Sequence, residues 1–85
     1  MRPLSNPADL IVGQVIHHQP RNTFYQILNK TMVKKETEGW EYGWSYQEVE
    51  VESVVHDVIV FTPNTTGIIY SRPFSKFDSD WMLPI

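Results

Sequence analysis

Residues 39–46 read GWEYGWSY, and an aromatic side chain occupies every second position of this stretch. Successive side chains of a β-strand point to opposite faces of the sheet, so a period of two predicts a strand with one aromatic face. The predicted aromatic face carries Trp40, Tyr42, Trp44 and Tyr46. We call these four residues the aromatic stripe.

The alternation continues in residues 48–52, EVEVE, but the apolar residues now stand at odd positions. A strand can accommodate this change of phase by a β-bulge, by a turn, or by a change in which face is buried. Glu48, Glu50 and Glu52, the acidic ladder, would share one face. They would repel each other by roughly a few tenths of a kcal/mol per pair unless Lys30, Lys34 or Lys35 lies opposite.

Short apolar runs on both sides of this stretch predict an all-β fold. Strands are expected in residues 10–18, 23–31 (with a possible extension to 38), 53–61 and 68–71. Residues 53–61 are the run richest in β-branched side chains and are therefore predicted as the central strand. Residues 62–67 end in Gly and predict a hairpin that joins this strand to the next.

The remaining segments are expected to be irregular. Residues 1–9 form an irregular lead-in, in which Ser5 or Asn6 before Pro7 predicts one capped helical turn. Residues 19–22 contain Pro and Asn and predict a turn. A short helical turn is expected over residues 74–78, near the carboxyl end.

Composition restricts the class of protein. Eighty-five residues make one domain, residues 1–85, and the absence of cysteine excludes disulfides and thiolate metal sites. A net charge of −3 disfavours nucleic acid binding by a general basic field. No apolar run of membrane-spanning length and no signal peptide is visible, so no membrane association and a cytoplasmic location are expected.

Four short segments carry a resemblance to a known family. They are GQVIHH (13–18), YQIL (25–28), DVIVF (57–61) and RPFSKF (72–77). In this order they resemble small bacterial and phage domains of unknown function with an SH3-like barrel, over roughly a third of the chain. The resemblance implies a small SH3-like barrel of about four to six antiparallel strands. Residues 33–54 would then be an enlarged, aromatic-rich excursion from that scaffold.

The histidines favour no catalytic site. His17 and His18 would point to opposite faces of a strand, and no Gly-rich phosphate loop or HExxH or GxSxG motif is present. The chain is therefore not expected to be an enzyme, and no cofactor or metal is expected. An enzyme built on His18 or His56 is the least favoured alternative.

Two interpretations of the aromatic stripe stay open. Its rings supply core to a small barrel, or they form a platform beside carboxylates, suited to cations, proline-rich segments or flat bases. The acidic ladder is likewise a solvated face that protects a sheet edge, or a patch that faces a basic partner. Arg72 could hold a carboxylate or a phosphate, or pair with Asp78 or Asp80.

We interpret the chain as a non-catalytic binding module for a protein partner with a basic or proline-rich surface. A small phage or bacterial accessory protein, such as an inhibitor of a host or defence factor, fits this description, and a homo-oligomer is compatible with it. The alternative is a binder of a nucleotide or cationic small molecule. The expected binding residues are Trp40, Tyr42, Trp44, Tyr46, Glu48, Glu50, Glu52 and Trp81.

Overall fold

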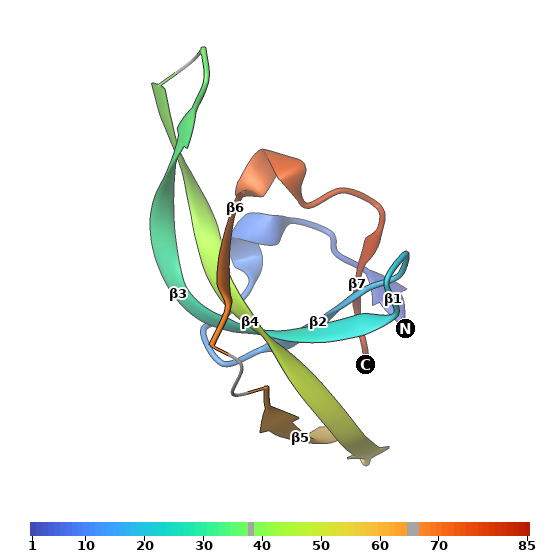
Figure 1. Cartoon of the computed structure of the whole chain (residues 1–85). Coiled ribbons are helices and arrows are strands. Elements are labelled where there is room, and N and C mark those ends of the chain that lie inside the picture. Colours follow the sequence, from blue (N-terminus) through green and yellow to red (C-terminus); the bar gives the residue numbers. More distant parts are fainter. Residues whose placement is uncertain (38, 65–66) are drawn as a thin grey trace.

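The structure, a computed structural model, describes residues 1–37, 39–64 and 67–85 (Figure 1). The described residues form one antiparallel sheet of seven strands, so the all-β prediction is confirmed. The strands are β1 (Arg2–Pro3), β2 (Val15–His18), β3 (Thr23–Lys35), β4 (Gly39–Val55), β5 (Val58–Pro63), β6 (Ile69–Pro73) and β7 (Trp81–Leu83). Two 3-10 turns complete the fold, η1 (Pro7–Asp9) and η2 (Phe74–Lys76).

β4 is the centre of the sheet. The strand order is β1-β7-β2-β3-β4-β5, and β6 also pairs with β4. Val49 pairs with Phe24 of β3 and with Pro63 of β5, so these two strands lie on opposite edges of β4. β5 and β6 therefore follow one another along the same edge. Residues 33–54, expected as an excursion, contain most of this central strand.

The sheet is not closed into a barrel within the described residues, because no pairing joins β5 or β6 to β1. Two long hairpins extend to opposite ends of the molecule, β3–β4 at one end and β4–β5 at the other (Figure 1). The molecule is accordingly elongated, with principal extents of 43 × 28 × 22 Å.

The change of apolar phase in β4 is resolved by a change of the buried face. Pairing with β3 continues without interruption from Tyr46 to Val49, so neither a bulge nor a turn lies there in β4. Tyr46 belongs to the main core, whereas Val49 is buried on the opposite face, where it pairs with Phe24. The register shifts lie elsewhere, at Leu28 of β3 and at Glu52 of β4.

An aromatic core holds the sheet together. Its buried members are Leu10, Ile16, Tyr25, Ile27, Trp44, Tyr46, Phe77 and Trp81. The Tyr46 ring lies 5.1 Å from Tyr25 and 5.5 Å from Trp81, both edge-to-face, the arrangement that aromatic quadrupoles favour. The Trp44 indole N–H donates to the Pro7 carbonyl at 2.7 Å, which ties η1 to the core. Asn6 caps this turn by accepting from the Ala8 amide, as predicted.

The run over residues 53–61 is not a central strand. It forms the end of the β4–β5 hairpin, whose turn residues His56 and Asp57 have positive φ angles of 51° and 63°. Positive φ at both central residues is typical of a type I′ turn, the turn that matches strand twist in tight hairpins. β-Branched content indicated strand structure correctly, but the run is not one strand, because residues 53–55 end β4 and residues 58–61 belong to β5. Within the described residues β5 pairs with β4 alone, so it lies at the edge of the sheet and not at its centre.

The two predicted loops have different outcomes. The turn over residues 19–22 is confirmed, with the Asn22 amide donating to the Gln19 carbonyl. The predicted hairpin over residues 62–67 falls partly on residues 65 and 66, outside the described residues. The strands on either side of it, β5 and β6, pair with β4 and not with each other, so a hairpin between them is wrong.

Candidate functional site

The aromatic stripe is divided between core and surface. Trp44 and Tyr46 are only 5% and 4% exposed, whereas Trp40 and Tyr42 are 62% and 53% exposed. The division arises because η1 and η2 cover β4 at Trp44, through Pro7 and Phe74, and the hairpin projects beyond them. The prediction of one platform made of all four rings is therefore wrong.

The exposed half of the stripe lies beside lysines. Tyr42 pairs across the sheet with Met32, and Trp40 pairs with Lys34. The Lys30 ammonium group lies 4.4 Å from the centre of the Tyr42 ring. Cations therefore occupy the places beside these rings where carboxylates were expected, and a cationic ligand is disfavoured there by repulsion.

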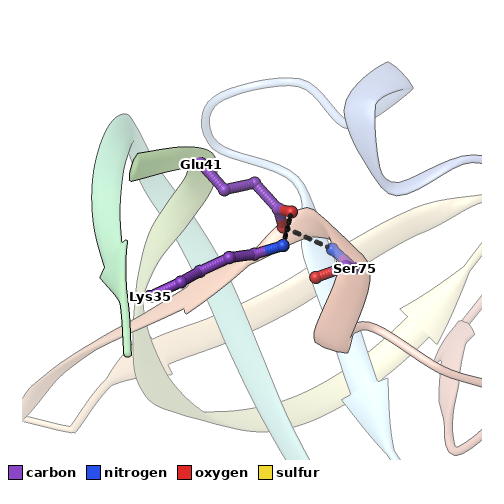
Figure 2. A network of polar contacts seen from close by, with 3 residues as sticks. All are labelled: Lys35, Glu41 and Ser75. Atoms are coloured by element: carbon purple, nitrogen blue, oxygen red, sulfur yellow. Dashed lines mark hydrogen bonds and ion pairs between the residues drawn. The ribbon is translucent and has the colours of Figure 1, made fainter. Parts of the chain in front are cut away.

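Glu41 fixes the projecting hairpin to the rest of the fold (Figure 2). Its carboxylate forms an ion pair with Lys35 at 2.7 Å and accepts the Ser75 backbone N–H of η2 at 2.9 Å. The Lys35 hydrogen bond, followed by the Ser75 amide, lowers the pKa of Glu41 from 4.5 to about 2. Glu41 thus has a structural role in positioning the exposed rings.

The acidic ladder has polar neighbours, not lysines. The Glu48 carboxylate accepts from the Asn64 side-chain amide, and Glu52 accepts from the Thr62 hydroxyl at 3.0 Å. Glu50 pairs across the strands with Thr62. Lys30, Lys34 and Lys35 pair with the other end of β4, at residues 39–44. In the described strand pairings no lysine therefore stands opposite the ladder, which lies at the base of the β4–β5 hairpin.

Three valines continue the same face toward the hairpin tip. Val55 pairs with Val58, and Val58 and Val60 alternate along β5, so the three side chains share one face. All three are at least 45% exposed. Thr62, two residues further along β5, places Glu50 and Glu52 at the border of this patch. We call Val55, Val58 and Val60 the valine face.

Trp81 lies in the core and not on an exposed surface. It is 2% exposed, and its ring packs tilted against Tyr25 and edge-to-face against Tyr46 and Phe77. Its ring also lines a small pocket, together with His18, Arg21, Tyr25, Tyr46, Tyr70 and Arg72. We call this the tyrosine pocket. Trp81 was expected to bind a partner, and this stays a prediction. Its ring is buried because it packs on Tyr25, Tyr46 and Phe77.

The tyrosine pocket was missed from the sequence. Arg72 was expected to pair with Asp78 or Asp80 or to hold an anion. In the structure its Nε donates to the Tyr46 hydroxyl at 3.2 Å and its Nη1 to the Lys76 carbonyl at 3.3 Å. The pocket residues come from five strands and from the turn between β2 and β3, so no local pattern could bring them together. The only local signal was an arginine next to a strand-ending proline.

The histidines do not converge. His17 is 4% exposed and its Nε2 lies 2.9 Å from the Asn22 side-chain oxygen, whereas His18 stacks on Trp81 with ring centres 4.5 Å apart. Across residues 1–37, 39–64 and 67–85, no three His, Asp or Glu side chains are grouped as metal ligands.

Among the described residues no helix has the length and apolar character to cross a membrane. Comparison of the chain with protein-family models, curated proteins and solved structures finds no match.

Proposed function

We propose that this chain is a non-catalytic protein-binding module that accepts an extended segment of its partner along β5. The observation that carries the proposal is the exposed valine face on a terminal strand of the sheet. Natural edge strands are commonly blunted by lysine, by inward charges or by a covering element. Residues 58–62 carry no charged side chain, and within the described part of the chain no strand covers their outer edge.

The chemistry of the partner follows from the border of the valine face. A strand added to β5 would place alternate apolar side chains against Val58 and Val60. Its end near Thr62 would meet Glu50 and Glu52, so Lys or Arg is expected there. The partner is therefore an extended basic and apolar segment. Of the two partner surfaces expected from the sequence, basic and proline-rich, the proposal keeps the basic one, because proline has no backbone N–H to donate to a neighbouring strand.

The family resemblance supports the same class of function. The four resembling segments lie on β2, β3, β5 and across β6 and η2, in one sheet. We propose an SH3-like barrel with an open edge, in a small phage or bacterial accessory protein of the cytoplasm. Inhibition of a host or defence factor is a use that a module with one docking edge could serve.

A model peptide tests the proposal. A peptide of alternating valine and lysine is titrated into the isotope-labelled protein, and a peptide of alternating valine and glutamate serves as the charge control. We expect saturable binding of the lysine peptide, with NMR shifts concentrated in residues 58–62. Val58→Lys should weaken binding by about tenfold or more, because it places a charge on the docking face.

The matched control is Val54→Lys. Val54 is exposed on the same hairpin but pairs with Ile59, so it points to the opposite face. Equal affinity of the Val58→Lys variant and the wild type would exclude β5 as the docking edge. A concentration-dependent dimer that Val58→Lys abolishes would assign this edge to a second copy of the chain instead.

A further inference from the structure

The tyrosine pocket brings aromatic rings and cations together near the middle of β4, at Tyr46, away from the exposed Trp40 and Tyr42. Tyr25, Tyr46 and Tyr70 form one wall, with Tyr46 and Tyr70 stacked at 5.5 Å and inclined by 22°. Trp81 and His18 form another part of the lining. β2, β3, β4, β6 and β7 all contribute, so the rigid part of the sheet holds the pocket in shape.

Two arginines give the pocket its charge. Arg21 extends from the turn between β2 and β3, and Arg72 from β6. Among the described residues neither guanidinium forms an ion pair with a carboxylate. Among the residues that the structure describes, no carboxylate lines the pocket, although the chain as a whole carries a net charge of −3. The pocket is therefore positively charged although the protein is acidic, as is expected of a site that binds an anion.

Burial and the two arginines both affect the titratable groups beside them. Burial, followed by Arg72 and then Arg21, lowers the pKa of His18, while Asp80 and Asp78 oppose the shift more weakly. Burial raises the pKa of Tyr25, and the Arg21 guanidinium beside its hydroxyl partly offsets this. The lowered pKa disfavours the protonated form of His18, and the two arginines are the cationic groups of the pocket.

Arg72 is held in place before any ligand arrives. Its Nε and Nη1 atoms are engaged by the Tyr46 hydroxyl and the Lys76 carbonyl, and its guanidinium carbon lies 5.1 Å from the Trp81 ring centre. A guanidinium has five N–H donors in a planar fork that matches the oxygens of phosphates and carboxylates. These two hydrogen bonds leave the remaining N–H groups of the guanidinium to donate to a ligand.

The size of the pocket decides what it can hold. Its volume is about 130 Å³, equivalent to about four water molecules at roughly 30 Å³ each. Whole drug-sized ligands occupy pockets of about 300 Å³ or more, so this pocket has room for a phosphate group, and the rest of a larger ligand would lie outside it. We propose that the tyrosine pocket binds the phosphate group of a small molecule, with Arg21 and Arg72 as its cationic contacts.

Titration with three small anions tests this site. Inorganic phosphate, phenyl phosphate and acetate are added separately, and binding is followed by NMR shifts and by the fluorescence of a Trp40→Phe variant, which retains Trp81 in the pocket and the buried Trp44. We expect saturable binding of both phosphates and weaker binding of acetate. Tighter binding of phenyl phosphate than of inorganic phosphate would indicate a phosphomonoester ligand, and equal binding would indicate free phosphate.

Two substitutions separate a built site from general attraction of anions. Arg21→Gln, at an exposed turn position, should weaken phosphate binding by about tenfold or more, because one charged hydrogen bond is lost. Lys34→Gln removes the same charge from the distant β3–β4 hairpin and should leave the affinity unchanged. Absence of saturable phosphate binding, or equal weakening by both substitutions, would overturn the proposal. Arg21→Gln tests the site even if an Arg72→Gln variant, which would remove the other cationic contact, does not fold.

Discussion

Trp40 and Trp44 have the same side chain and the same phase in β4, but they differ in what surrounds them. Trp44 packs on Phe74 and binds the Pro7 carbonyl, whereas Trp40 is mostly exposed. We expect Trp44→Ala to lower the free energy of unfolding by about 3–5 kcal/mol, the range for removing a buried aromatic ring. Trp40→Ala should change it by less than about 0.5 kcal/mol. Urea unfolding followed by circular dichroism measures both, and similar losses would contradict the division of the stripe.

Glu41 should make stability depend on pH. Its pKa is lower in the folded chain, at about 2, than the ordinary value of 4.5. The stabilisation is therefore fully present above pH 4.5 and is lost as the pH falls toward 2. The wild type should exceed Glu41→Gln in stability above this window, and the difference should shrink within it. NMR titration of the Glu41 carboxyl group checks the pKa directly, and a midpoint near 4.5 would refute the ion pair as its cause.

Between elements, β6 approaches β4 closely at Gly43. A Cβ atom at Gly43 would lie 2.2 Å from the Arg72 carbonyl oxygen, which is backbone and cannot rotate away. Gly43→Ala should therefore cost about 1–3 kcal/mol of stability, as overpacking does, and loosen β6 from β4. Ser53→Ala, at the exposed end of the same strand, is the control and should be nearly neutral. A neutral Gly43→Ala variant would mean that β6 does not approach so closely.

The sequence specified individual strands better than their arrangement. The period of two in residues 39–46 predicted β4, and Asn6 before Pro7 predicted its capped turn, because both signals depend on neighbouring residues alone. The burial of a side chain depends on which other strands and turns pack against its own strand. Neighbouring residues in the sequence do not reveal these partners. Trp44 and Trp40 therefore could not be distinguished, and the valine-rich run of residues 53–61 was placed at the centre instead of the edge. The tyrosine pocket could not be found for the same reason.

For the molecule as a whole, the position of the core predicts how stability is distributed. Backbone amides of residues 23–27 and 44–49 lie in paired strands beside the core, whereas residues 54–60 lie in an exposed hairpin. Hydrogen exchange should accordingly be slowest in the first two segments and faster in the hairpin, because local opening there exposes little apolar surface. Exchange measured by NMR or mass spectrometry tests this. Equal protection throughout would indicate that the hairpin is covered, for example by a second copy.

The bulge at Leu28 has a consequence for which single-residue deletions β3 can tolerate. Before Leu28 the odd-numbered Ile27 shares the face of Tyr46, and after it the even-numbered Met32 shares the face of Tyr42. Loss of the Leu28 codon would remove the extra residue and leave every later side chain of β3 on its present face. Loss of one codon closer to the hairpin tip, such as that of Thr31, would exchange the two faces up to the turn. A single-residue deletion should therefore be tolerated at Leu28 more readily than at Thr31.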